Sequence, residues 1–356
     1  MKKIIKDRGA VYFNEGSWAT LSNILENLCP TKVFVLTDTN TKTHCLELFL
    51  KNVPFNIVPE VLTISAGERH KTISTSVALW SELSEKGADR RSLLINLGGG
   101  VVTDLGGFVA SSFKRGIEFI NIPTSLLAMV DASIGGKNGV DLGILKNQIG
   151  VIRNPKCVII DSMFLETLPE EQVISGYAEI LKHGLIHSES YWNAASRFDI
   201  KNKVETDALI WGSVEIKNEV ITEDPNENGR RKTLNYGHTL GHAIESYLLK
   251  HSNKEALLHG EAIAIGMILA TYISSEENAF PKSKLEIVTQ TILRSFPKVT
   301  FSDIDIAAII KLLIYDKKND NGKVHFVLLS DFGSHTMNNE ISNSTIKKAF
   351  DYYKNF

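Results

Sequence analysis

The sequence contains few cysteines, no excess of charge of either sign and no long apolar run. Cys29, Cys45 and Cys157 are widely spaced and form no Cys-x-x-Cys pair, which argues against a disulfide framework and against a structural zinc site built on cysteine. A formal net charge of −2 provides no long-range field that favours nucleic acid or a membrane surface, so an anionic substrate would have to be held by local cations. Nowhere do about 18 apolar residues follow one another, and the basic start lacks the apolar run of a signal peptide. We therefore expect a cytoplasmic protein that binds neither nucleic acid nor membranes.

The hydrophobic pattern predicts two domains of different class. At 356 residues the chain can bury two cores, and its 43% apolar and 22% charged residues are typical of a globular protein. From about residue 30 to residue 160, short apolar runs alternate with helical patterns, which predicts a mainly parallel sheet with helices on both faces. From Thr167 onward the pattern is helical almost throughout, apart from a strand-like run at 325–329. The sequence thus predicts an α/β, Rossmann-like domain over residues 1–165 and an all-α domain over residues 166–356.

Polar residues or glycines follow several of the predicted strands, at the sheet edge where α/β domains bind ligands. Asp38 lies near the end of the run Val33–Asn40, where it could contact a ribose or simply cap the next helix. A second run leads into the glycines 98–100, where backbone N–H groups and a helix N-terminus could bind a diphosphate. Because Thr103 replaces the last glycine of the usual Gly-x-Gly-x-x-Gly pattern, an ordinary tight turn is the alternative.

Two further stretches of this half combine cations with glycine. Glu68 and Lys71 stand three residues apart, on one face of a predicted amphipathic helix at its start. Residues 131–147 are rich in glycine, lysine and asparagine. That composition is typical of a solvated loop, but an open backbone with projecting lysine and asparagine also suits recognition of a phosphate or a polyol.

The most distinctive stretch of the sequence, residues 231–261, contains three histidines. His238 and His242 are four residues apart, which on a helix places them on one face. His259 follows a polar segment that is expected to be a loop, so it could return to the same place. Three imidazoles, or two with a carboxylate, are the ligands of a zinc ion that keeps one position open for substrate. A histidine pair satisfied by helix packing is the alternative.

Glu179 is a second candidate metal ligand. It stands in an otherwise apolar predicted helix, three residues before Lys182. A buried carboxylate must be paired with a cation or bound to a metal. Glu179 is therefore either a third ligand or the partner of Lys182 in an intrahelical ion pair, and both interpretations stay open at this point.

Taken together, these residues resemble the motifs of the 3-dehydroquinate synthase family, within the sugar phosphate cyclases, over essentially the whole chain. The motifs that carry the resemblance are Gly67-Glu68-x-x-Lys71, Gly98-Gly99-Gly100-Val-Val-x-Asp104, Lys114-Arg115-Gly116, Pro123-Thr124-Ser125, Asp131 to Lys137, Lys146-Asn147, Glu179-x-x-Lys182, Arg231-x3-Asn235-x2-His238-x3-His242 and His259-Gly-Glu261. The chain departs from the family pattern in a slightly longer segment between His242 and His259, and in Gly333-Ser334 where a Gly-Lys is common. Neither departure removes a matched ligand.

The resemblance implies an enzyme that binds zinc, with cobalt as a substitute, and uses NAD as cofactor. It implies that the metal ligands are Glu179, His238 and His259, so that His242 faces the substrate instead. The cofactor would contact Asp38, Asn40, Glu68, Lys71, Gly99, Gly100, Val101, Asp104, Thr124, Ser125, Lys137, Lys146, Thr167 and Leu168. The sugar phosphate substrate would contact Asp131, Lys137, Asn147, Lys182, Lys217, Arg231, Asn235, His242 and Lys317. Arg115 would reach the phosphate across the interface of a homodimer.

The resemblance also implies a reaction of the shikimate pathway, which leads to the aromatic amino acids. In it, 3-deoxy-D-arabino-heptulosonate 7-phosphate would be oxidised transiently by NAD, lose phosphate, be reduced again, open its ring and close to 3-dehydroquinate by an intramolecular aldol step. The alternatives are another sugar phosphate cyclase, a metal-dependent polyol dehydrogenase and a nucleotide-binding protein without activity. Lys182, Asn235 and His242 favour dehydroquinate over the products of other cyclases, whereas a dehydrogenase would accumulate NADH.

Overall fold

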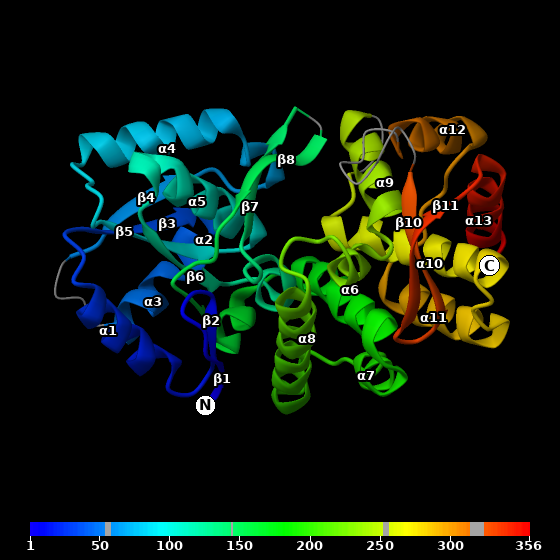
Figure 1. Ribbon diagram of the computed structural model, residues 1–356, viewed down its shortest axis with the longest axis horizontal. Coiled ribbons are helices and arrows are strands. Elements are labelled where there is room, and N and C mark those ends of the chain that lie inside the picture. The colour runs from blue at the N-terminus through cyan, green and yellow to red at the C-terminus, as the bar shows by residue number, and fades with distance from the viewer. Residues whose placement is uncertain (54–57, 144, 252–255, 314–323) are drawn as a thin grey trace. The chain divides into compact units, whose positions relative to one another are not determined.

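The computed structural model describes residues 1–53, 58–143, 145–251, 256–313 and 324–356. These residues form two compact units, Met1–Val173 (unit 1) and Ile174–Phe356 (unit 2). Helix α6 (Glu170–His187) begins in unit 1 and continues into unit 2 (Figure 1). The division falls a few residues beyond the boundary at residue 165 that the sequence suggested.

Unit 1 is built on a seven-stranded sheet in the order β1-β2-β9-β6-β5-β3-β4. The strands are β1 (Lys2–Ile4), β2 (Ala10–Phe13), β3 (Val33–Asp38), β4 (Glu60–Ile64), β5 (Leu93–Gly98), β6 (Glu118–Pro123) and β9 (Cys157–Ile160). Only β1 runs antiparallel to its neighbour; the other pairings are parallel. Strand β5 is buried along its whole length, as expected for a parallel strand covered on both faces. The predicted α/β class is confirmed.

Helices cover both faces of this sheet (Figure 1). They are α1 (Ser17–Leu28), α2 (Thr39–His44), α3 (Leu46–Asn52), α4 (Ile73–Glu85) and α5 (Gly100–Ser112), with short helical turns at Glu68–His70, Phe113–Arg115, Ala128–Ala132 and Ser162–Thr167. On one face, Leu79 of α4 and Leu105 of α5 pack into one core with Phe34 of β3. On the other, Trp18 of α1 contacts the rings of Phe49 and Phe164.

The stretch 131–147, which could have been a solvated loop, contains most of an antiparallel hairpin. Its strands are β7 (Lys137–Leu142) and β8 (Leu145–Ile152). The glycines serve close packing here: a Cβ on Gly139 would lie 2.7 Å from the carbonyl oxygen of Ile149, and a Cβ on Gly107 of α5 would lie 1.9 Å from the side-chain oxygen of Asn138. A composition that is typical of loops therefore belongs to strands that lie unusually close to their neighbours.

Unit 2 is mainly helical, as predicted, with one added hairpin. Its further helices are α7 (Glu189–Ala195), α8 (Lys203–Glu223), α9 (His238–Lys250), α10 (His259–Glu277), α11 (Lys282–Ser295), α12 (Asp303–Leu312) and α13 (Asn343–Asn355), with a 3-10 turn at Arg230–Asn235. Strands β10 (His325–Asp331) and β11 (Ser334–Glu340) pair antiparallel, and β10 contains the strand-like run of the sequence.

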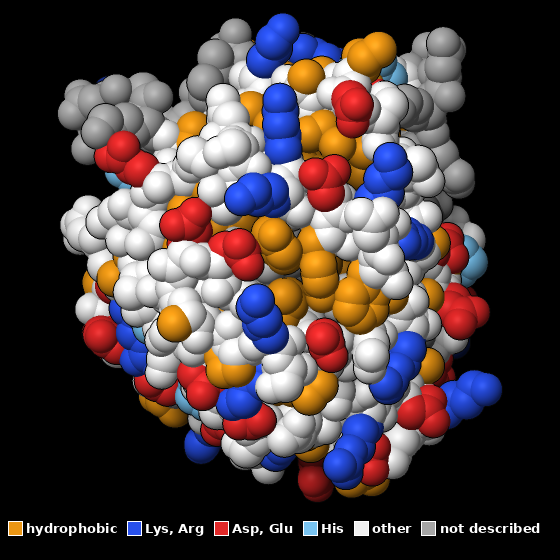
Figure 2. Space-filling model, turned by 90° about the vertical axis from the view of Figure 1, so that its right-hand side faces the viewer, with side chains coloured by type: hydrophobic (Ala, Val, Ile, Leu, Met, Phe, Trp, Pro, Cys, Tyr) orange, Lys and Arg blue, Asp and Glu red, His pale blue; other side chains and the backbone are white. Residues whose placement is uncertain are grey.

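Helix α10 forms the core of unit 2. Its residues from Ala262 to Ile273 are almost all buried, because α9, α11, α13 and β10 pack around it. Figure 2 shows the face of unit 2 on which the C-terminal helices lie, with acidic and basic side chains interspersed around a small apolar patch. None of the helices among the described residues combines the length and the apolar character that crossing a bilayer requires.

Candidate active site

The three histidines singled out in the sequence come together in unit 2. His238 and His242 lie one turn apart on α9, and His259 is the first residue of α10. The ring centroid of His238 lies 5.2 Å from that of His242 and 5.6 Å from that of His259. Each ring offers a nitrogen, and these nitrogens lie within 4.8 Å of one another.

Glycines allow the helices that carry these histidines to approach closely. A Cβ on Gly266 of α10 would lie 2.1 Å from the carbonyl oxygen of Gly237, the residue before α9. A Cβ on Gly260 would lie 2.0 Å from the carbonyl oxygen of Ser175 on α6, and the Gly260 N–H donates to the Ser175 hydroxyl at 3.0 Å. Since Ser175 lies one turn before Glu179, this contact brings Glu179 to His259.

Glu179 is fully buried and contacts two of the histidines. Its Oε1 lies 3.4 Å from Nε2 of His238 and 3.7 Å from Nε2 of His259. Its Oε2 forms an ion pair with Lys182. Burial by itself would raise the pKa of this carboxyl, but Lys182 and His238 outweigh burial and hold the pKa of Glu179 well below its usual range. The ion pair of Glu179 with Lys182 is therefore observed, and the role of Glu179 as a third metal ligand stays a prediction.

The outer nitrogens of two rings are held by groups of unit 2. Nδ1 of His238 contacts the carbonyl oxygen of Tyr236 at 3.1 Å, and Nδ1 of His259 contacts the carboxylate of Glu245 at 3.3 Å. Both Nε2 atoms consequently face Glu179. Burial lowers the pKa of His238 below its usual value. Burial would also lower the pKa of His259, but its hydrogen bonds to Glu179 and Glu245 raise it to about 9.

This donor set fits a zinc-like ion. Ligand atoms that each lie about 2.1 Å from a tetrahedral metal are about 3.4 Å apart, close to the separations of Glu179 from the two histidines. A histidine that binds a metal through one ring nitrogen ordinarily donates a hydrogen bond from the N–H of the other nitrogen to a carbonyl or carboxylate oxygen. The Nδ1 atoms of His238 and His259 lie in position to do so. His242 lies beside the set, at 5.6 Å between its ring centroid and that of His259.

Buried cations accompany the histidines within unit 2. Lys182, Lys217 and Arg231 are at most 6% exposed. Arg231 donates to the carbonyl oxygen of Pro225 at 2.7 Å. The loop before Arg231 also contains a residue that the sequence analysis did not assign to the site: Glu227 has a φ of 62° and accepts a hydrogen bond from Asn235 at 2.6 Å.

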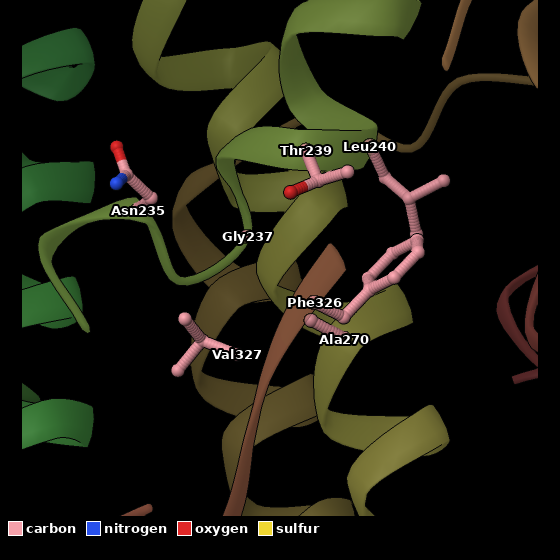
Figure 3. Close-up of a pocket in the computed structure, with 7 residues that line it drawn as sticks. All are labelled: Asn235, Gly237, Thr239, Leu240, Ala270, Phe326 and Val327. Atoms are coloured by element: carbon pink, nitrogen blue, oxygen red, sulfur yellow. The ribbon is translucent and has the colours of Figure 1, made fainter. Parts of the chain in front are cut away.

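A narrow pocket beside this group is mostly apolar. It is lined by Asn235, Gly237, Thr239, Leu240, Ala270, Phe326 and Val327. Figure 3 shows the side chain of Asn235 on one side of Gly237, and Leu240 and Phe326 on the other. Since the lining residues carry no charge, this pocket supplies no cation for an anionic substrate.

In unit 1, four residues predicted to contact the cofactor, together with Asn147, which is predicted to contact the substrate, form one network around Lys71. Its Nζ lies 3.0 Å from Glu68, 3.3 Å from Asp104 and 2.7 Å from the side-chain oxygen of Asn147. Lys146 reaches Glu68 at 2.7 Å. Burial would lower the pKa of Lys71, but the surrounding carboxylates raise it above its ordinary value. Burial likewise opposes ionisation of Glu68, but Lys71 and Lys146 hold its pKa below the usual range.

Asp141 belongs to this network, although the sequence analysis did not single it out. It lies on β7, and its Oδ1 accepts a hydrogen bond from the backbone N–H of Asn147 at 2.7 Å. The backbone N–H of Asp141 donates to the carbonyl oxygen of Lys71 at 2.9 Å. Asp141 thus ties together two predicted site residues, and the glycine-rich composition around it concealed the strand that places it.

The glycines 98–100 join β5 to α5 at the carboxyl end of the sheet. The N–H of Thr124, at the end of β6, donates to the carbonyl oxygen of Gly98 at 3.1 Å. In the neighbouring strand β3, Asp38 accepts hydrogen bonds from the backbone N–H groups of Asn40 and Thr41 at 2.9 and 2.8 Å, so it caps α2. The capping interpretation of Asp38 is therefore observed, and its contact with a ribose stays a prediction.

The remaining predicted residues lie in different parts of the chain. In unit 1, Arg115 ends the turn after α5 with a φ of 70°, Asp131 lies in the turn Ala128–Ala132 and Lys137 begins β7. Val101 lies in α5, and Ser125 follows the end of β6. Thr167 ends the short helical turn that precedes α6, and Leu168 follows it directly. Lys317 and most of the polar segment before His259 lie outside the described residues.

Comparison with known proteins identifies the family. The model "3-dehydroquinate synthase N-terminal" matches residues 61–175, and "3-dehydroquinate synthase C-terminal" matches residues 176–319. The chain belongs to the 3-dehydroquinate synthase family. The 3-dehydroquinate synthase of Parabacteroides distasonis is 41% identical over 336 residues, which cover 94% of each chain. That of a Sulfurovum species is 36% identical over 324 residues, or 91% of each chain.

Solved structures of related enzymes share the fold of this 3-dehydroquinate synthase family member. A 2-deoxy-scyllo-inosose synthase complexed with carbaglucose-6-phosphate, NAD⁺ and Co²⁺ is 28% identical, with a TM-score of 0.81 over 98% of each chain. A 2-epi-5-epi-valiolone synthase from Streptomyces hygroscopicus with NAD⁺ and Zn²⁺ bound has a TM-score of 0.86 over 100% of this chain and 99% of that one. At 21% identity, the second likeness concerns the fold alone.

Proposed function

We propose that this protein is a 3-dehydroquinate synthase, a carbon–oxygen lyase that converts 3-deoxy-D-arabino-heptulosonate 7-phosphate into 3-dehydroquinate and phosphate. Family membership supports the reaction. The observation that carries the proposal is the set Glu179, His238 and His259, whose inner atoms converge while the outer nitrogens of both rings are held. This arrangement suits a metal that keeps a position open for substrate.

A metal ion and NAD would complete the proposed site. Glu179, His238 and His259 would hold Zn²⁺ or Co²⁺. NAD would contact unit 1 at the glycines 98–100, at Asp38 and in the network around Lys71. When bound, NAD supplies a reversible hydride acceptor and the metal supplies Lewis acidity toward a hydroxyl group, so the protein's own task is to bind and orient.

Buried cations of unit 2 would bind the anionic and hydroxylated parts of the substrate. Lys182, Lys217 and Arg231 are desolvated, and charge-assisted hydrogen bonds are stronger in such surroundings. Asn235, held by Glu227, would orient a hydroxyl group. His242, beside the proposed metal ligands, would move a proton during elimination and ring closure.

The phosphate would be held by residues of unit 1, with help from a second protomer. Lys137 and Asn147 would bind the phosphate, Lys317 would add a cation, and Asp131 would contact the substrate. We propose that the enzyme acts in the cytoplasm as a homodimer in which Arg115 reaches the partner's phosphate site. Its left-handed backbone, with a φ of 70°, follows Lys114 at 48°, so this turn projects two successive cations in an unusual conformation.

Product analysis tests the proposed reaction. Purified protein incubated with the heptulosonate phosphate, NAD and Zn²⁺ should yield 3-dehydroquinate, identified by carbon NMR. The related cyclases make other carbocycles, so conversion of a hexose phosphate to an inosose or of a heptulose phosphate to a valiolone, without conversion of the heptulosonate phosphate, would assign the protein to another branch of the sugar phosphate cyclases.

A further inference from the structure

Glu245 has no role in the proposed reaction, yet it contacts a proposed metal ligand. It lies on α9 at the positions i+7 from His238 and i+3 from His242, so all three residues share one face of the helix. Glu245 is 4% exposed, and its Oε2 lies 3.3 Å from Nδ1 of His259, which begins the next helix. Burying a carboxylate is costly, so this position requires a specific partner.

The imidazole ring of His259 needs a contact from another helix to hold its orientation. As the first residue of α10, it has no preceding helical turn to pack against, and its side chain is 31% exposed. His238 is held differently, because its Nδ1 contacts the backbone carbonyl of Tyr236, only two residues away. In the neutral ring that binds a metal, a hydrogen bond from Nδ1 of His259 to Glu245 keeps the proton on Nδ1 and leaves the lone pair on Nε2, the atom that faces Glu179 at 3.7 Å.

We propose that Glu245 is a positioning residue that orients His259 and strengthens its binding to the metal. The inference rests on the proposed metal site. A carboxylate that accepts the second N–H of an imidazole ligand fixes the tautomer, fixes the ring angle and makes the ligating nitrogen more basic. Loss of such a partner ordinarily lowers metal affinity about 10–100-fold.

Metal affinity, rather than turnover, tests this role. Apo protein carrying Glu245→Ala or Glu245→Gln would be titrated with Zn²⁺ against a competing chelator, and the visible absorption spectrum of the Co²⁺ form would report ligand geometry. We expect Glu245→Ala to bind Zn²⁺ about 10–100-fold more weakly. Glu245→Gln, which keeps an acceptor oxygen without the charge, should lose less affinity and shift the Co²⁺ bands.

Asp305→Asn is the matched control. Asp305 of α12 is also buried, at 5% exposure, and accepts hydrogen bonds from the hydroxyl of Tyr247, which lies on α9 like Glu245, and from the backbone N–H of Ser302, neither of which is a proposed ligand. This variant should lose stability while binding Zn²⁺ as the wild type does. Wild-type affinity and an unchanged Co²⁺ spectrum in Glu245→Gln would overturn the proposal, and this isosteric variant remains informative if Glu245→Ala does not fold.

Failure of the proposed metal site gives a different result. If His259→Ala binds Zn²⁺ as tightly as the wild type, His259 is no ligand, and both the site and the role of Glu245 are wrong. If His259→Ala loses the metal but neither Glu245 variant changes affinity or spectrum, only the role of Glu245 is wrong.

Discussion

At the scale of single residues, buried charges mark the candidate functional residues within each unit. Glu179 and Lys182 in unit 2 are almost completely buried, as is Lys71 in unit 1. Charges in such positions are tolerated only when they are paired, and removal of one partner leaves the other uncompensated. In unit 2 the pairing includes two imidazoles, which is what distinguishes this cluster from an ordinary intrahelical ion pair.

The network around Lys71 predicts a dependence of stability on pH. The folded-state pKa of Glu68 is depressed by Lys71 and Lys146, so Glu68 stabilises the fold above its unfolded pKa of about 4.3, and this contribution disappears as the pH falls through the lower folded-state value. Urea unfolding of Glu68→Gln should give a lower free energy of unfolding than the wild type at pH 7, and the difference should narrow below about pH 4.

An exposed carboxylate is the control for this measurement. Glu47 pairs with Lys51 one turn away on the surface of α3, so Glu47→Gln should change the free energy of unfolding little at any pH. A difference between Glu68→Gln and the wild type that stays constant from pH 7 to pH 3 would contradict the assignment of Glu68 as a carboxylate held ionised by the two lysines.

The sequence predicted the placement of single residues well where that placement depends on their spacing along one helix. The spacing of His238 and His242 predicted a shared helix face, and the structure has it. Glu245 could not be found in this way, because its contact with His259 joins two helices across an intervening segment. Glu179 remained ambiguous for a physical reason: the same carboxylate contacts Lys182, His238 and His259, so an ion pair with Lys182 does not exclude a role as metal ligand.

At the scale of elements, glycines determine how closely the helices of unit 2 pack. Gly260 lies against Ser175 of α6, and Gly266 lies against Gly237 at the start of α9. The first contact places the beginning of α10 beside α6, one turn before Glu179, and the second places the beginning of α9 beside the middle of α10. Together they bring Glu179, His238 and His259 close to one another. Helical periodicity indicates which face of a helix is buried but not how near its neighbour lies, so the sequence could not predict this geometry.

Gly260→Ala tests the close approach of α10 to α6. The added Cβ would lie 2.0 Å from the Ser175 carbonyl oxygen, so the helices must separate, at a cost of about 1–3 kcal/mol in the free energy of unfolding. Separation also moves His259 away from Glu179, and we therefore expect weaker Zn²⁺ binding in chelator competition.

Gly212→Ala is the matched control for Gly260→Ala. Its Cβ would meet the ring of Tyr191 at 2.6 Å, on helix α8 and not at a proposed ligand. This variant should lose stability with unchanged Zn²⁺ affinity. Equal affinity of the two variants for Zn²⁺ would show that the packing of Gly260 does not position the ligands.

Strands of unit 1 that are buried could be predicted from the sequence, whereas the hairpin β7–β8 could not. The apolar runs before Asp38 and before the glycines 98–100 predicted the central strands β3 and β5, because these strands are buried along almost their whole length. The strands β1 and β2, which precede residue 30, were not predicted. The hairpin β7–β8 was not recognised, since many of its residues are polar and two of its glycines, Gly139 and Gly150, serve the close approach of the strands to each other. Tertiary packing, which the local pattern does not contain, decided the conformation there.

At the scale of the whole molecule, the proposed homodimer can be tested by complementation. If Arg115 serves the partner's site, Arg115→Ala and Lys182→Ala should each be nearly inactive, whereas a mixture refolded together should regain activity. Random association would make about half of the dimers mixed. Each mixed dimer has one site with both intact residues and one site with neither, so we expect about a quarter of the wild-type activity. Both variants should sediment as dimers. No recovery from mixed dimers that are shown to form would mean that Arg115 serves its own protomer.

The proposed reaction cyclises a sugar phosphate without net oxidation. Phosphate release and NADH absorbance should be followed in one reaction containing 3-deoxy-D-arabino-heptulosonate 7-phosphate, NAD and Zn²⁺. We predict that phosphate is released while NADH does not accumulate, and that a chelator abolishes the release. Accumulation of NADH with simple polyols, without phosphate release from the heptulosonate phosphate, would contradict the account and identify a dehydrogenase.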